Sequence, residues 1–228
     1  MQNRVQNNII NLEDINLSFG SREIFKNLSL AIPEGKITAI LGPSGSGKTT
    51  LLRLLSGQIL PNSGKVTLMG ENVGTISERN LYKIRTKMGV LFQSGALFTD
   101  MTVFDNVAFA LREHTKLDES MINTLVLLKL QSVGLRALKD SFPGQLSGGQ
   151  ARRAALARAI ALDPALLLYD EPFAGQDPIS MGVLIRLIKN LNDALKITSV
   201  VISHDVEEVL SIADHACILG EGRIIAYG

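Results

Sequence analysis

The chain has 228 residues, of which 46% are hydrophobic and 20% are charged, and its formal net charge is +1. This composition excludes a disordered chain, and the near-neutral charge argues against a nucleic-acid binder. A single cysteine, Cys217, excludes an internal disulfide, and no apolar run approaches the ~18–20 residues of a membrane span.

The amino terminus carries no sign of a targeting segment. Residues 1–8 lack the apolar core of a secretory signal. Together with the cysteine count, this predicts a cytoplasmic protein. If it acts at a membrane, we expect it to do so through a partner, as a peripheral subunit on the cytoplasmic face.

Residues 9–32 alternate between apolar and polar side chains, as at Ile10, Leu12 and Leu17. Such alternation is typical of strands with one buried face, and Gly20-Ser21 is a turn signal between two of them. We therefore predict an antiparallel β part at the start of the chain.

The next run is the most informative in the sequence. Residues 36–41 predict a buried strand, residues 50–55 predict a helix, and the sequence between them fits the phosphate-binding loop G-x-x-x-x-G-K-[ST]. Backbone N–H groups at such a turn converge on phosphate oxygens, and the helix N-terminus adds positive potential. We expect Lys48 to neutralise the β- and γ-phosphates and Thr49 to bind Mg²⁺; the alternative is a glycine-rich turn that matches by chance. The predicted nucleotide-binding residues are Gly42, Pro43, Ser44, Gly45, Ser46, Gly47, Lys48, Thr49 and Thr50.

Gln93 follows a further strand-like run, residues 87–92. Its amide oxygen can reach a metal ion or water, although a polar residue leaving a strand is common without any such role. Beyond it, residues of about 94–145 are richer in helical patterns, at 103–112 and 119–133, and contain no central strand. We predict a helical subdomain inserted into an α/β core of about residues 1–93 and 146–228.

Residues 146–150, Leu-Ser-Gly-Gly-Gln, precede a helical pattern that we place at 151–161. Ser147 is a good N-cap, and Gly148 and Gly149 leave backbone N–H groups exposed at the helix start, which favours an anion. Helix capping alone is the simpler interpretation. Because the chain already has one phosphate loop, a second anion site suggests a nucleotide shared between two molecules.

An apolar strand at 165–169 ends in two carboxylates, Asp170 and Glu171. Open α/β sheets bind ligands beyond the carboxyl ends of their strands, so we expect Asp170 to hold Mg²⁺ and Glu171 to polarise the attacking water. Solvated acidic residues are nevertheless common at strand ends. Asp177 and Pro178 then predict the start of a long amphipathic helix that runs to Leu195.

His204 follows a strand at 198–202 and is the third polar group at the same predicted sheet edge. It can hydrogen-bond the γ-phosphate, although a lone histidine at a strand end is often only a surface residue. His114 and His215 have no such placement and are expected to be ordinary polar residues. Cys217 lies in an apolar run and is expected to be a small core residue.

At this point the chain resembles the ATP-binding cassette (ABC) ATPases from about Ile10 to Gly228. The motifs match in order and spacing, and together they are far more specific than the phosphate loop alone. The resemblance implies a P-loop NTPase fold with a mostly parallel core sheet, an antiparallel β part and an inserted helical subdomain. The residues that carry it are the loop 42–49, Gln93, Leu146–Gln150, Asp170, Glu171, Asp177 and His204.

The resemblance implies ATP and Mg²⁺ as ligands and a head-to-tail pair of cassettes. Each ATP would lie between the phosphate loop of one copy and Ser147, Gly148, Gly149 and Gln150 of the other. It further implies that Phe19 stacks on adenine, that Thr49, Gln93 and Asp170 bind the metal, and that Glu171, His204 and Lys48 catalyse hydrolysis.

Within the family, three segments are similar to the ATPases of Mla-type phospholipid transporters: residues 92–98, 100–107 and 173–182. This resemblance implies an ATPase that powers phospholipid transport between inner and outer membrane. Its partners would be an MlaE-like permease, an MlaD-like lipid-binding component and a small MlaB-like regulatory subunit. Such ATPases usually continue beyond the position of Gly228 with a tail, for which the resemblance implies a contact with the dimer partner.

Other functions stay open. One is the import or export of a different substrate. Another is an ABC ATPase of DNA repair or translation, which the lack of a heptad run between Lys48 and Ser147 and the single cassette disfavour. A P-loop kinase is disfavoured by Leu146–Gln150 and by the Asp170-Glu171 pair.

Overall fold

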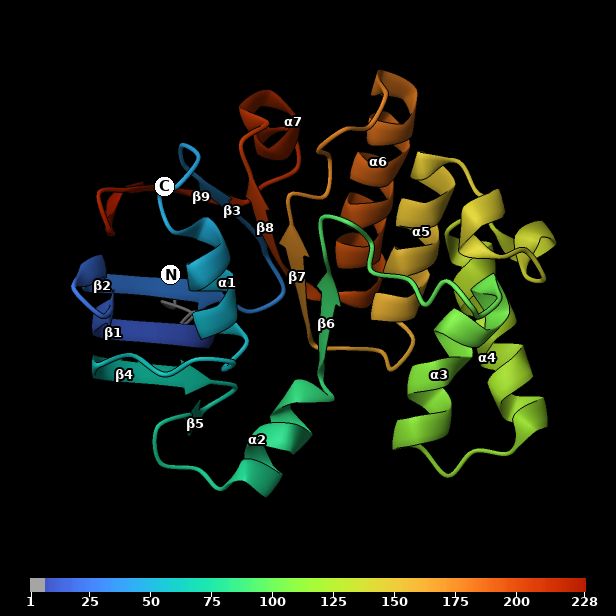
Figure 1. Cartoon of the computed structure of the whole chain (residues 1–228), viewed down its shortest axis with the longest axis horizontal. Helices are drawn as coiled ribbons and strands as arrows, with labels where there is room; N and C mark the ends of the chain where they lie inside the picture. Colours follow the sequence, from blue (N-terminus) through green and yellow to red (C-terminus); the bar gives the residue numbers. More distant parts are fainter. Residues whose placement is uncertain (1–6) are drawn as a thin grey trace, which may run out of the picture.

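Two β-sheets, with helices packed around them, make up the structure, a computed structural model that describes residues 7–228 (Figure 1). The expectation about the amino-terminal signal concerns residues 1–8, of which 1–6 lie outside the described part. Among residues 7–228, none of the helices has the length and apolar composition that crossing a bilayer requires.

The first sheet is antiparallel, as the alternation in residues 9–32 predicts. Its strand order is β2-β1-β4-β5, and β1 and β2 meet at a turn in which Gly20 has φ 60°. The side chains of Ile10, Leu12 and Leu17 are all buried. The strands are β1 (Asn8–Phe19), β2 (Arg22–Pro33), β4 (Ser63–Leu68) and β5 (Glu71–Asn72).

The second sheet has the order β10-β9-β3-β8-β7-β6 and is parallel except for β10, which pairs with β9 in a hairpin. Its inner strands are apolar on both faces because both faces are covered. In β7, for example, Leu166 and Leu168 face the antiparallel sheet and α1, whereas Leu167 and Tyr169 face the other helices. The strands are β3 (Ile37–Leu41), β6 (Met88–Leu91), β7 (Leu166–Asp170), β8 (Thr198–Ser203), β9 (His215–Gly220) and β10 (Arg223–Tyr227).

Figure 1 shows α1 on one side of this sheet and α5 and α6 on the other, with α3 and α4 farther out beside α5. Two short 3₁₀ turns, Arg136–Leu138 and Pro143–Gln145, lead from α4 into α5. The helices are α1 (Lys48–Leu55), α2 (Glu78–Arg85), α3 (Val103–His114), α4 (Glu119–Ser132), α5 (Gly148–Ala159), α6 (Pro178–Leu195) and α7 (Val206–Leu210).

The fold class is confirmed, and most predicted elements lie within one or two residues of their observed bounds. Helix α6 starts at Pro178, where the Asp177 carboxylate accepts from the N–H groups of Ile179 and Ser180. The predicted N-cap of α5, Ser147, is confirmed, whereas the helical pattern placed at 151–161 starts three residues later than the helix itself. The helix begins at Gly148 because Ser147 caps it there, which outweighs the low helix propensity of two glycines.

The segment of about 94–145 is helical, as predicted, and it shares its core with the rest of the chain. Val107 of α3 and Val126 of α4 belong to the same buried cluster as Leu167 of β7 and Val201 of β8. Helix α5 lies between the two parts, since it packs against α3, α4 and β6. The division of the chain into core and subdomain stays a prediction.

Gly89 of β6 lets α5 approach the sheet closely. A Cβ atom at this position would lie 2.3 Å from the carbonyl oxygen of Ala159 and 2.5 Å from Leu167 Cδ2. The backbone of α5 therefore occupies the space that any other residue would need.

We expect Gly89→Ala to destabilise the protein by ~1–3 kcal/mol, because overpacking forces helix and strand apart. For a chain of this size each kcal/mol lowers the melting temperature by ~2–4 °C, which calorimetry resolves. Gly144→Ala is the control, since no atom lies within 4 Å of the added Cβ. Equal melting temperatures for the two variants would contradict this account of the packing.

Candidate nucleotide-binding and hydrolysis site

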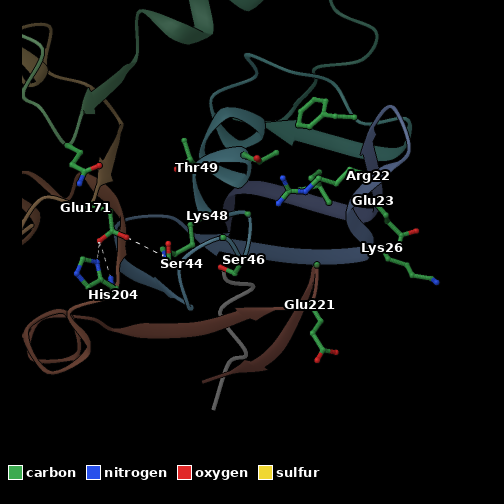
Figure 2. Close-up of a pocket in the computed structure, with 17 residues that line it drawn as sticks. Arg22, Glu23, Lys26, Ser44, Ser46, Lys48, Thr49, Glu171, His204 and Glu221 are labelled. Atoms are coloured by element: carbon green, nitrogen blue, oxygen red, sulfur yellow. Dashed lines mark hydrogen bonds and ion pairs between the residues drawn. The ribbon is translucent and has the colours of Figure 1, made fainter.

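A cleft of about 1010 Å³ lies between the phosphate loop, the end of β1 and the carboxyl ends of the parallel strands. Figure 2 shows Ser44, Ser46, Lys48 and Thr49 on one side of Glu171 and His204. The cleft lining includes, of the residues predicted from the sequence, Phe19, Ser44, Gly45, Ser46, Gly47, Lys48, Thr49, Thr50, Gln93, Glu171 and His204.

Lys48 is buried at the first position of α1, with 8% of its surface exposed. Its Nζ donates to the carbonyl oxygens of Gly42 at 2.8 Å and Pro43 at 3.1 Å, and it lies 3.5 Å from Glu171 Oε1. These contacts hold the positive charge of Lys48 beside the first residues of the phosphate loop. A phosphate oxygen is the natural further partner for that charge.

Two further features of the phosphate loop, residues 42–49, suit it to binding phosphate groups. Gly47 has φ 99°, which only glycine adopts without strain, and it directs the loop into the N-terminus of α1. The buried Oγ of Ser46 has no hydrogen-bond partner within residues 7–228. A buried hydroxyl without a partner is costly, and a phosphate oxygen would satisfy it.

Glu171, directly after β7, contacts residues that follow β3 and β8. Its Oε2 accepts from the backbone N–H of His204 at 3.1 Å and lies 2.8 Å from His204 Nδ1, while Oε1 faces Lys48 (Figure 2). Glu171 has φ 46°, a left-handed backbone conformation that is strained for a glutamate. The surrounding contacts offset that strain, and strain of this kind is concentrated at functional sites.

Burial raises the pKa of Asp170, and the neighbouring negative charge of Glu171 adds to this, while Lys48 opposes it. A divalent cation nearby would favour the ionised carboxylate again. The oxygen donors of Asp170, Thr49 and Gln93 are of the type that Mg²⁺ prefers, and Thr49 and Gln93 line the cleft. The side chains of these three residues therefore have the chemistry that Mg²⁺ binding requires.

A different set of possible cation ligands also lies close together. Ligand atoms of Glu171, His204 and Asp205 lie within 4.8 Å of one another. Hydrogen bonds within the protein already occupy this group, since Asp205 Oδ2 accepts from Ser203 and Glu171 accepts from His204.

The far end of the cleft contains the predicted residue Phe19 together with residues that the sequence analysis missed. Phe19, at the end of β1, is 48% exposed and available for stacking. Arg22 and Lys26 of β2 add positive charge, and Gly222 arrives from the β9–β10 turn, where its carbonyl accepts from Lys26 N–H at 3.1 Å. Apart from Phe19, the basic residues after the Gly20 turn were the sign of this wall in the sequence.

The predicted residues of the Leu-Ser-Gly-Gly-Gln motif, Ser147, Gly148, Gly149 and Gln150, are not part of this cleft. They begin α5, on the opposite side of β7 from α1 (Figure 1). Ser147 Oγ accepts from Gln150 N–H, and Gln150 Oε1 accepts from Ser147 N–H, which forms a capping box. Within one chain, therefore, this motif does not meet the phosphate loop.

The model of a family described as "ABC transporter" matches residues 25–174, which include the phosphate loop and the Leu-Ser-Gly-Gly-Gln motif. The chain belongs to the ABC transporter family. The chain is also 59% identical to the intermembrane phospholipid transport system ATP-binding protein MlaF of Escherichia coli (strain K12), over 97% of this chain and 82% of that protein.

Solved ABC cassettes share the whole fold. cbiO1 from Clostridium perfringens, part of the ABC transporter complex cbiONQ, is 31% identical with a TM-score of 0.91, over 98% of this chain and 89% of that one. The bacterial cassette MJ0796 is 30% identical with a TM-score of 0.87, over 96% and 97% of the two chains, and its structure is dimeric. A second MJ0796 structure is a post-hydrolysis state bound to ADP and Pi. The ABC ATPase identity, with ATP as ligand, is thus confirmed for this chain.

Proposed function

We propose that this ABC ATPase hydrolyses ATP to power phospholipid transport between the inner and outer membranes. The observation that carries the chemistry is the Glu171 carboxylate between Lys48 and His204, directly beside the phosphate loop. The substrate class is supported by the 59% identity to MlaF over nearly the whole chain.

In the proposed reaction, the loop amides and Lys48 bind the β- and γ-phosphates of ATP. Glu171 then accepts a proton from the attacking water, and His204 orients the carboxylate and reaches the γ-phosphate. Mg²⁺, held by Thr49, Gln93 and Asp170, would neutralise charge on the phosphates. Phe19 would stack on the adenine at the other end of the cleft.

The proposed active form is a homodimer, which the dimeric MJ0796 cassette supports. Ser147 and Gly148 are exposed, and the N-terminus of α5 presents free N–H groups to solvent. In the dimer these groups would close over the γ-phosphate held by the other copy. Each copy would give and receive the same contact, as two-fold symmetry requires.

The proposed contact with an MlaE-like permease is an apolar groove of about 550 Å³, which is separate from the nucleotide cleft. Its walls come from α2, β6, α3 and the segment after Gln93, and they include the partly exposed rings of Tyr82, Phe98 and Phe109. Phe98 packs against Phe109, and the Arg158 guanidinium lies 5.6 Å from the ring centroid of Phe98. We further propose MlaD-like and MlaB-like subunits in the complex and a location on the cytoplasmic face of the inner membrane.

Glu171→Gln tests the hydrolytic step. We expect ATP to bind with unchanged affinity and turnover to fall by ~10²–10⁴-fold, because the amide cannot accept the proton. Phosphate release by the purified complex and fluorescent-nucleotide binding measure the two effects. Glu23→Gln, which changes another carboxylate in the cleft lining, is the control, and full turnover by Glu171→Gln would reject the assignment.

Ser147→Arg tests the shared site. A long cationic side chain should block ATP-driven dimerisation, measured by light scattering, and leave ATP binding to the single chain intact. Ser147→Ala removes the same helix cap, at a cost of ~0.5–2 kcal/mol, without filling the interface. If Ser147→Arg weakened nucleotide binding as much as it weakened hydrolysis, the motif would not act across a dimer.

Phe98→Glu tests the permease groove. A carboxylate beside Phe109 should reduce co-purification with the permease and transport by the complex, because burying it against apolar side chains is costly. ATP binding to the chain alone should not change. Leu60→Glu is the control, since it alters an exposed apolar residue outside the groove. Normal assembly and transport with Phe98→Glu would place the permease elsewhere.

A further inference from the structure

Arg152, on the first half of α5, is a buried cation without a carboxylate. Only 9% of its surface is exposed, and among residues 7–228 no acidic side chain lies within 4.0 Å of its guanidinium. Burial lowers its pKa. A buried charge with no counter-charge is expensive unless hydrogen bonds replace those lost from water.

The hydrogen bonds of Arg152 go to two loops that are far apart in the sequence. One terminal nitrogen donates to the carbonyl oxygen of Phe92, immediately before Gln93, at 3.1 Å. The other donates to the carbonyl oxygen of Ala174, three residues before Asp177, also at 3.1 Å. The planar guanidinium presents its donors in a rigid fork, so the two carbonyls are held at a fixed separation.

The same two parts of the chain also contact α5 at other points. At the start of α5, a Cβ atom on Gly149 would lie 2.4 Å from Ser180 Oγ in the first turn of α6 and 3.5 Å from Gln176 Oε1 in the loop before α6. Near the end of α5, Arg158 donates to the carbonyls of Gly95 and Ala96. Arg152 lies between these contacts and is the residue bonded to both loops.

We propose that Arg152 is a positioning residue that holds the Gln93 loop and the Asp177 loop in register with Ser147, Gly148 and Gly149. This inference rests on the proposed ATPase function. Because Arg152 bonds both loops, the two loops and α5 move together. Displacement of the Gln93 loop, where the γ-phosphate and the permease groove meet, then shifts the α5 N-terminus that faces the partner's nucleotide. Arg152 is not among the residues that line the nucleotide cleft, and it acts through the two backbone carbonyls.

Amide hydrogen exchange on the full chain tests the link directly. The N–H of Gly95 donates to Phe92 O, and the N–H of Gln176 donates to Phe173 O, so both amides report on loops bonded to Arg152. In Arg152→Met we expect both to exchange about tenfold faster, the factor that losing one charge-assisted hydrogen bond gives. Arg153→Met is the matched control, because Arg153, next along α5, donates to the carbonyl of Val133 and, within residues 7–228, to neither of the two loops.

Steady-state kinetics of the assembled complex give the second readout. We expect Arg152→Met to lower kcat for ATP by ~10–100-fold, as a misplaced site does, with KM within about twofold of wild type. Arg153→Met should lower the melting temperature about as much as Arg152→Met does, but it should change kcat little. Arg152→Lys keeps the charge and reaches one carbonyl only, so it should fall between wild type and Arg152→Met, and it replaces Arg152→Met if that variant fails to fold.

Faster exchange in only one of the two loops, or equal effects of Arg152→Met and Arg153→Met on kcat, would overturn the proposal. An inactive wild-type complex would instead reject the proposed function. The exchange measurements need no turnover, so they would still decide whether Arg152 links the two loops.

Discussion

The carboxylate of Glu171 is the point on which the rest of the site depends. It faces a lysine at the start of α1 and a histidine directly after β8, and it follows the last residue of β7. These strands are neighbours in the order β3-β8-β7, with Leu41 level with Ser203 and Asp170 level with Ile202. The parallel sheet therefore brings three reactive groups together without any single loop having to reach across the molecule.

The same geometry explains why one chain holds only half of the proposed machinery. Strands β3 and β8 place the phosphate loop on one side of β7, and α5 starts on the other side (Figure 1). Both features present backbone N–H groups from a helix N-terminus, and each has the polarity to bind an anion. A nucleotide that uses both must lie between two copies. In the proposed dimer, hydrolysis would depend on association, because the α5 N-terminus of one copy would reach the nucleotide of the other only in the closed pair.

Helix α5 connects the cleft to the helical segment between residues 94 and 145. This helix packs on β6, α3 and α4, and its arginines bond carbonyls in three separate loops. Asn106 of α3, fully buried, exchanges hydrogen bonds with the backbone of Phe98 and so anchors the far end of the segment after Gln93. The apolar groove at Phe98 and the nucleotide cleft at Gln93 are thus two ends of one well-packed segment.

The sequence by itself determined the local pieces: the phosphate loop with its strand and helix, the capped starts of α5 and α6, and the apolar parallel strands. Each depends on residues a few positions apart, whose hydrogen bonds and periodicity are local. It also identified the family, because several such pieces occur in order. It missed β4, β5, α2 and the β9–β10 hairpin, all of them short. Of these, β4 and β9 pair with strands that are distant in the sequence, β1 and β3. Only the tertiary structure decided that Glu171 lies between Lys48 and His204, that Gly222 closes the far wall of the cleft, and that Arg152 bonds both Phe92 and Ala174. Those contacts join residues far apart in the chain, and their positions follow from strand order and helix packing, which no local pattern encodes.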